Sequence, residues 1–419
     1  MDKINKLQRQ SSFSSNAQLL IETAREKQIP VLKLAPEYDL FQLGQGKYSV
    51  LFRGLVAENS ASILSTFNDE GLIKRLLDDF NFYKPNKLAD NDRENYKILI
   101  VNKQIKAALK ISENSESDIL IQLNEETKNL ILKLSKLYNL NIAEIALSSV
   151  DITAPIITSG EITDININPT LNQYQEVVNL KAITQQLIDY YTPSRIPIIS
   201  VIANNNQIVV NIIARILENI KLTPGIIINN VIYNYNFATA KNNEGVKTLL
   251  QDKEMEALLH GVTAKELQQS GLPYEHSNLL LITDIKKAEQ LNLQQLNNRS
   301  FVLGIDKKCD LRMMRQWSKE RIIYCSLNHD NLMLQQQLKS KHPAVFTTAN
   351  NLVLFDGVDQ LPVIALNRLI PVARSDANIM SGILFAVAAA FRLEIPIFVI
   401  RSVLENLSGN EIVDIVDTK

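Results

Sequence analysis

The sequence predicts an α/β chain of two modules, the second of which is a doubly wound sheet. In the second half, apolar β-branched runs alternate with stretches that carry apolar residues at helical spacing, which is typical of a parallel sheet covered by helices. In the first half, pairs of strand-like runs are joined by short turn sequences. The connection YYTPSR at residues 190–195 separates the two patterns. We therefore place one domain at residues 1–192 and the other at residues 193–419.

The first module is predicted to mix hairpins with single helices. Residues 16–28 have helical periodicity, residues 29–34 have a strand pattern, and residues 38–57 read as a hairpin that turns between Gly44 and Gly46. A helix is expected at 70–80 and a charged loop at 86–96. Residues 96–111 form a second hairpin with Asn102 and Lys103 at its turn, and a capped helix follows at 124–140. Two short strands then flank Pro155.

The second module is predicted to begin with the strand SRIPIISVI at residues 194–202. A helix follows it, with apolar residues at 208, 212, 213, 216 and 217. The later strands are NLLLITDI, RSFVLGID, RIIYCSL and NLVLFDG, and helical stretches separate them.

Composition excludes several classes of function. The chain carries 44 Lys and Arg against 45 Asp and Glu, so no net charge recruits nucleic acid or an anionic membrane. Two cysteines are too few for a disulfide framework and fit a reducing compartment. The longest apolar run, ILFAVAAAF, is half the length that spans a bilayer, and the N-terminus has no apolar core for export. We expect a cytoplasmic protein.

The segment SVIANNNQIVVNIIARIL, at residues 200–217, has the strand, loop and helix of a phosphate-binding loop. The loop has no glycine, lysine or hydroxyl where phosphate chemistry needs them. It is therefore either an ordinary strand-to-helix turn or the frame of a nucleotide site whose chemistry has been removed.

The order of segments resembles the cyanophycin synthetases, which join an ATP-grasp module to a Mur-ligase-like module and build a polymer of Asp and Arg. The resemblance rests on IPVLKLAPEYDLFQLGQGKY, LIKRLLDDFNFYKPN, EITDININP, SRIPIISV and ARSDANIMSGILFAVAAAF, in collinear order over most of the chain. It implies a reduced ATP-grasp-like domain, followed by a doubly wound domain like the central domain of Mur ligases, without the third domain. In active members it implies ATP and Mg²⁺ as cofactors.

The chain departs from this family where the chemistry would lie. The family carries TGTNGKTT at its phosphate loop, and the residues here are Ala203, Asn204, Asn205, Asn206, Gln207 and Ile208. Gln207 replaces the lysine that neutralises phosphate charge, and Ile208 replaces the hydroxyl that holds magnesium. Asn206 could adopt a left-handed conformation in place of a glycine. These six positions are interpreted as a degenerate nucleotide-binding loop.

The family's catalytic glutamate falls at Gly261, with His260 and Lys265 nearby on what reads as an exposed helical stretch. Its catalytic histidine falls in residues 286–292, which offer no equivalent. In the first domain only ten residues separate Pro85 from Tyr96, too few for the flap over ATP. In the family an Asp-Lys pair opens the first helix of this domain. The pair is Asp69 and Glu70 here, so a negative side chain replaces the positive one. We assign no catalytic residue.

Asp164 and Asn166 keep the spacing of the family's magnesium-binding strand, and strand alternation places both side chains on one face. The earlier acidic partner of that site is Ala146 here, so the metal would lose a charged ligand. We interpret the pair as a remnant metal site, with polar alternation at a strand edge as the alternative.

The four histidines share no metal-ligand spacing and are expected at the surface; they are His260, His276, His329 and His342. Trp317 is expected at a domain or subunit contact.

The resemblance and its losses predict a catalytically inactive cyanophycin synthetase-like protein that serves as a structural or scaffolding subunit. We expect it to assemble with an active cyanophycin synthetase or with itself, with no cofactor, nucleic acid or membrane. One alternative is a residual ATP-dependent amino acid or peptide ligase, which would use ATP and Mg²⁺. Another is a module that binds cyanophycin or its dipeptide.

Overall fold

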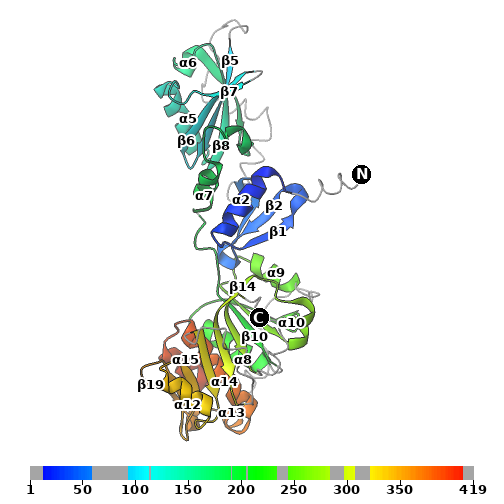
Figure 1. The fold of residues 1–419 in the computed structure, drawn as a ribbon, viewed down its shortest axis with the longest axis vertical. Helices are drawn as coiled ribbons and strands as arrows, with labels where there is room; N and C mark the ends of the chain where they lie inside the picture. Colours follow the sequence, from blue (N-terminus) through cyan, green and yellow to red (C-terminus); the bar gives the residue numbers. More distant parts are fainter. Residues whose placement is uncertain are drawn as a thin grey trace. The chain divides into compact units, whose positions relative to one another are not determined.

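The computed structural model describes residues 13–58, 93–112, 115–189, 191–203, 206–233, 244–283, 297–306 and 321–408, without the side chains of 115–116 and 297–299. The chain divides into two compact units, Met1–Arg195 and Ile196–Lys419, close to the boundary expected at 192/193 (Figure 1). The expected helix at 70–80, together with Asp69, Glu70, Trp317 and residues 286–292, lies outside the described residues.

The first unit begins with helix α2 (Ser15–Glu26) and a four-stranded antiparallel sheet. Its strands are β1 (Val31–Ala35), β2 (Leu40–Leu43), β3 (Val50–Arg53) and β4 (Val56–Ala57). The predicted hairpin is β2 and β3, joined through the short helix η2 (Gly46–Tyr48). Gly44 has φ +80°, and a Cβ atom there would lie 2.2 Å from the carbonyl oxygen of Tyr48. This turn therefore requires glycine at position 44.

A second antiparallel sheet in this unit has the order β7-β6-β5-β8-β9 and is called the five-stranded sheet below. Its strands are β5 (Glu94–Val101), β6 (Gln104–Ser112), β7 (Ser115–Asp118), β8 (Ile142–Ser149) and β9 (Gly160–Asn166). Asn102 and Lys103 join β5 to β6 with φ values of 48° and 62°. Two consecutive positive φ values are the requirement of a tight type I′ hairpin, so the predicted turn is confirmed.

Each face of the five-stranded sheet packs against a different apolar cluster. Side chains that include Ile98, Ile100 and Ile145 join one cluster with α5 (Glu125–Leu137) and α6 (Ile156–Ser159). The predicted cap of α5 is confirmed, because the Asn124 side chain accepts hydrogen bonds from the backbone N–H groups of residues 126 and 127. Leu99 and Val101, on the opposite face, join a cluster with α2, the β2–β3 hairpin and α7 (Leu180–Asp189).

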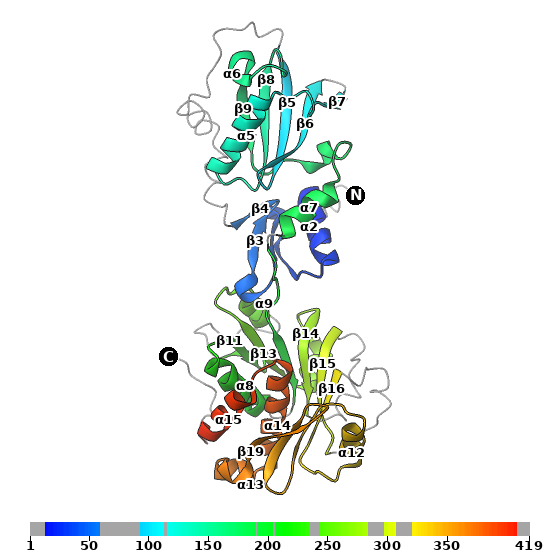
Figure 2. The same ribbon diagram turned by 90° about the vertical axis from the view of Figure 1, so that its left-hand side faces the viewer.

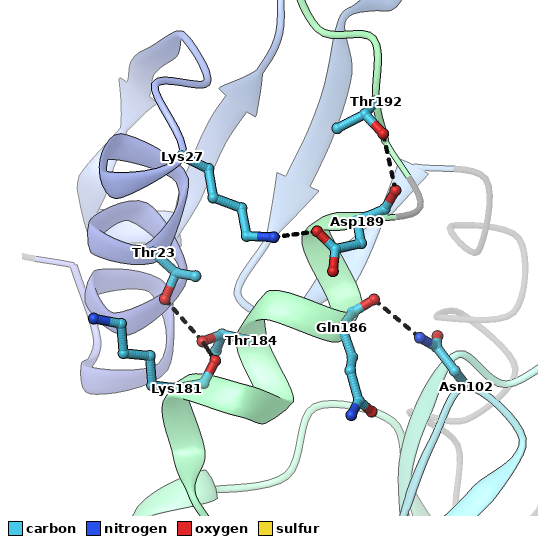
Figure 3. Close-up of polar contacts among 8 residues, drawn as sticks. All are labelled: Thr23, Lys27, Asn102, Lys181, Thr184, Gln186, Asp189 and Thr192. Atoms are coloured by element: carbon cyan, nitrogen blue, oxygen red, sulfur yellow. Dashed lines mark hydrogen bonds and ion pairs between the residues drawn. The ribbon is translucent and has the colours of Figure 1, made fainter.

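Helices α2 and α7 lie side by side and are joined by polar contacts along their length (Figure 3). The buried hydroxyls of Thr23 and Thr184 are 2.8 Å apart, and Lys27 forms an ion pair with Asp189. The Asn102 side chain donates to the backbone carbonyl of Gln186 at 3.0 Å. The β5–β6 turn, α7 and α2 are therefore tied together within the first unit.

The second unit is built on a ten-stranded sheet of order β12-β11-β13-β10-β14-β15-β16-β17-β18-β19. Strands β11, β13, β10, β14, β15, β16 and β17 are parallel to one another, whereas β12, β18 and β19 pair antiparallel. The strands are β10 (Ile198–Ile202), β11 (Pro224–Ile228), β12 (Val231–Ile232), β13 (Ala257–Val262), β14 (His276–Ile282), β15 (Asn297–Gly304), β16 (Ile322–Ser326), β17 (Ala344–Thr347), β18 (Asn351–Phe355) and β19 (Gln360–Ala365).

Helices cover both faces of this sheet, which confirms the doubly wound prediction (Figure 2). One face packs against α8 (Asn206–Asn219), α14 (Ala377–Arg392) and α15 (Ile397–Asn406). The other face packs against α10 (Ala264–Ser270) and α12 (Leu332–Lys339). The unit also contains α9 (Glu244–Gln251) and α13 (Pro371–Ser375). No helix in the described part of the chain is both long and apolar enough to cross a membrane.

Candidate functional site

The loop interpreted as a degenerate phosphate loop lies between the end of β10 at Ile202 and the start of α8 at Asn206, at the carboxyl edge of the parallel strands. This edge is where open α/β sheets bind ligands. Asn206 is buried in the first turn of the right-handed helix, and its Nδ2 atom donates to Oδ1 of Asn229 at 3.1 Å. Ala203 is buried after β10, and Asn204 and Asn205 lie outside the described residues. The Asn206 amide is thus hydrogen-bonded to the turn that follows β11.

Ile208, which stands where the resembled family has its magnesium-binding hydroxyl, is part of the apolar core. Ile208 is 6% exposed and belongs to the cluster between the sheet, α8 and α14. Its Cγ2 atom would lie 2.6 Å from a Cβ atom placed on Gly382 of α14, so the two helices approach closely at this residue. A hydroxyl at position 208 would therefore enter a hydrocarbon contact. Gln207, next to it, is partly buried.

Gly261 lies near the end of β13 and faces the first turn of α8. A Cβ atom at Gly261 would lie 3.1 Å from Cγ and 3.2 Å from Cβ of Asn206. These distances are shorter than ordinary van der Waals contacts, so a glutamate at this position would need Asn206 to move.

His260 is not a surface residue, and the prediction that placed it on an exposed helical stretch is wrong. It lies within β13 and is 1% exposed, because α10 and the following loop cover this face of the sheet. Its Nδ1 atom is 2.8 Å from the hydroxyl of Tyr274, and burial lowers the pKa of the imidazole to about 4. Lys265 is exposed on α10, His329 is exposed, and His276 and His342 are partly exposed.

His260 begins a chain of buried hydroxyl groups across three strands. The Tyr274 hydroxyl is 2.7 Å from Oγ of Ser200 on β10, which is 2.9 Å from Oγ of Ser277 on β14. Ser277 in turn has the carbonyl oxygens of Ile198 and Leu279 at 3.0 and 2.8 Å. Carbonyls only accept hydrogen bonds, so the arrangement with the most bonds directs every proton away from His260 and places its own proton on Nδ1.

Asp164 and Asn166, the pair interpreted as a remnant metal site, lie on one face of the five-stranded sheet. Asp164 is directly opposite Ala146 on β8, and Asn166 is directly opposite Glu144. Asp164 is exposed, whereas the Asn166 side chain accepts a hydrogen bond of 3.0 Å from the backbone N–H of Asn168. The amide that would serve as a metal ligand is therefore also used to shape the turn after β9.

Glu144 is a polar residue of this face that the sequence did not single out. It is 5% exposed, and its Oε2 atom accepts hydrogen bonds from the Tyr174 hydroxyl at 2.8 Å and from Gln173 Nε2. Lys97 on β5 places its Nζ atom 3.2 Å from Oε1 of Glu144 and donates to Gln173 Oε1 at 3.1 Å. The four side chains form one polar network, called the Glu144 network below.

Helix α2 holds the segment that completes the Glu144 network. The Asn16 side chain donates to the carbonyl of Pro169 at 2.7 Å and accepts from the N–H of Leu171 at 3.1 Å. These two hydrogen bonds fix the start of the short helix η5 (Leu171–Tyr174), which carries the two residues that donate hydrogen bonds to Glu144. The contact joins residues more than 150 positions apart, so local sequence patterns could not reveal it.

These residues do not fit a magnesium ion. Among the described residues there is no group of three or more His, Cys, Asp or Glu side chains that could hold a metal. On this face, the buried carboxylate of Glu144 is already neutralised by an ammonium group, whereas Mg²⁺ requires near-octahedral oxygen ligands.

A cavity in the first unit lies where its two apolar clusters meet, lined by residues that include Phe52, Val56, Asn102, Ile142 and Tyr191. Its interior of about 20 Å³ has room for roughly one water molecule. It is too small to hold a nucleotide.

No protein-family model and no curated protein matches the chain. Among solved structures, the chain is similar to a UDP-N-acetylmuramoyl-L-alanyl-D-glutamate–2,6-diaminopimelate ligase, with a TM-score of 0.39 and 12% identity over 54% of this chain and 49% of that chain. It is similar to MurF from Acinetobacter baumannii, with a TM-score of 0.33 and 13% identity over 51% and 46% of the two chains.

The chain is also similar to a bifunctional glutathione synthetase from Pasteurella multocida, with a TM-score of 0.32 and 10% identity over 44% of each chain. It thus spans about half the length of these structures or less. Because the TM-scores are below 0.5, the roles of individual residues rest on the contacts within this chain.

Proposed function

We propose that this protein is a catalytically inactive relative of the ATP-dependent ligases, and that it serves as a structural subunit. The observation that carries the proposal is that the positions aligned with the chemical groups of the resembled family are used here for internal packing. Ile208 fills the contact between α8 and α14, and the amide of Asn206 occupies the space above Gly261. On the five-stranded sheet, Lys97 neutralises the buried carboxylate of Glu144.

The proposed partner is an active cyanophycin synthetase or a second copy of this chain. The order of sequence segments supports that family, and apolar packing surfaces can persist after a few catalytic groups are lost, because packing does not depend on ionisable residues. In this role the chain would stabilise or position the polymerising subunits.

The proposal is tested by mixing the purified chain with a purified active cyanophycin synthetase and measuring sedimentation velocity. We expect the chain to sediment with the synthetase, or alone as a dimer or larger assembly. Assayed without the synthetase, it should release no phosphate from ATP in the presence of Asp, Arg and a polymer primer. A chain that stays monomeric with and without the synthetase, or that hydrolyses ATP under these conditions, would contradict the proposal.

A further inference from the structure

The polar groups on the face of the five-stranded sheet that carries Glu144 form two rows across its strands. Lys97, Ala146 and Asp164 are direct neighbours in one row, and Leu99, Glu144 and Asn166 are direct neighbours in the next. Adjacent strands lie about 4.8 Å apart, so the groups of both rows are within reach of one another. The Lys97 side chain crosses from its own row to the carboxylate of the next, at 3.2 Å.

We propose that the Lys97 ammonium is a tethered cation that takes the charge role of a divalent metal on this face. On this account the wild-type chain does not bind Mg²⁺ there, whereas loss of Lys97 creates a cation site from Glu144, Asp164 and Asn166. The inference rests on the proposed loss of nucleotide chemistry and names the residue that replaces the metal.

The burial of Glu144 is the reason that a cation is needed. A carboxylate removed from water is costly unless it is paired and hydrogen-bonded, and Glu144 is 5% exposed. Tyr174 and Gln173 supply hydrogen bonds to one oxygen, and the positive charge comes from Lys97 at the other oxygen. Gln173 also accepts a hydrogen bond from Lys97, so the ammonium is held at two points.

Removal of the Lys97 ammonium would leave the negative charges on this face of the five-stranded sheet uncompensated. With Lys97 present, Glu144 is neutralised, and the exposed carboxylate of Asp164 is the charge that remains beside it on β8 and β9. Without Lys97, two carboxylates and the amide oxygen of Asn166 lie on adjacent positions of β8 and β9. Carboxylate and amide oxygens are the ligands that hard divalent cations prefer.

The test compares the unfolding temperatures of the wild type, Lys97→Met and Lys97→Met/Glu144→Gln, in MgCl₂ or MnCl₂ and in NaCl of equal ionic strength. Methionine keeps the length of the lysine stem without its charge. We expect Lys97→Met to unfold roughly 5 °C below the wild type in NaCl, because the buried carboxylate loses its partner. Divalent salt should restore part of this loss and leave the wild type unchanged.

The double variant is the matched control, because it lacks both the ammonium and the carboxylate. It should unfold above Lys97→Met in NaCl and show no response specific to divalent cations. Equal responses of Lys97→Met and the wild type to divalent salt, or a response that persists in the double variant, would overturn the inference.

A parallel scan of the wild type with Mg²⁺ and ATP together separates the two proposals. A rise in unfolding temperature with Mg²⁺ and ATP but not with Mg²⁺ alone would contradict the proposed loss of nucleotide chemistry, and the charge role of Lys97 would still stand. No response to Mg²⁺ and ATP, combined with no divalent response of Lys97→Met, would overturn this inference alone.

Discussion

At the scale of single residues, Ile208 and Asn206 of the loop interpreted as degenerate are both packing positions. The contact between Ile208 and Gly382 joins α8 to α14, and the contact between Asn206 and Gly261 joins α8 to the end of β13. In both pairs the glycine leaves room for the neighbouring side chain. Each pair therefore makes a prediction that can be measured with two single variants and one double variant.

Gly382→Ala is expected to lower the free energy of unfolding by about 1–3 kcal/mol, because the new methyl group would lie 2.6 Å from Cγ2 of Ile208. The measurement is urea denaturation of Gly382→Ala, Ile208→Ala and the double variant. The double variant should lose less stability than the sum of the two single variants. Additive losses would show that the two residues are not in contact.

Gly261→Glu is expected to lower the free energy of unfolding by about 1–3 kcal/mol, because its Cβ atom would lie 3.1 Å from Cγ of Asn206. Asn206→Gly removes the obstructing side chain. Denaturation should therefore show a smaller effect of Gly261→Glu in the Asn206→Gly background than in the wild type. An equal loss of unfolding free energy in both backgrounds would show that the Asn206 side chain does not cause the clash.

At the scale of elements, the hydrogen-bonded chain from His260 to Ser277 links β13, β10 and β14 on the side that α10 covers. Burial lowers the pKa of His260 from 6.5 to about 4. As the pH falls from 6.5 to 4, the unfolded chain binds a proton at this imidazole while the folded chain does not. The free energy of unfolding should therefore fall with pH over this window, by about 3 kcal/mol in total.

His260→Asn tests this pH dependence, because asparagine does not titrate and keeps a side-chain N–H for Tyr274. Urea denaturation of both proteins at pH 7 and pH 4.5 should show a larger loss of stability at low pH for the wild type. Carboxylates elsewhere are common to both proteins, so their effects cancel in the comparison. Equal losses in the two proteins would mean that His260 is not buried in its neutral form.

The elements that the sequence predicted correctly are those set by local physical rules. The turn at Asn102 and Lys103, the cap at Asn124 and the alternation of strands and helices in the second unit depend on neighbours in the sequence. His260 and Glu144 were missed because their surroundings come from distant segments. Tyr274 reaches His260 from the loop after α10, and Lys97 reaches Glu144 from another strand. No local pattern marks either contact.

At the scale of the whole molecule, the two units share one property although each is folded around its own cores. On the two proposals made above, side chains of the same chain take the place of a nucleotide or its metal in each unit. Ile208 and Asn206 do so in the second unit, and Lys97 does so in the first. The central claim is therefore that the folded chain does not bind nucleotide.

The most direct test of this claim is calorimetric titration of ATP with Mg²⁺ into the folded wild-type chain. An ATP-binding ligase titrated under the same conditions serves as the positive control. We expect no saturable heat for this chain at ATP concentrations up to about 1 mM, a dissociation constant that corresponds to a binding free energy of about −4 kcal/mol. Saturable binding with a dissociation constant below about 1 mM would contradict the account.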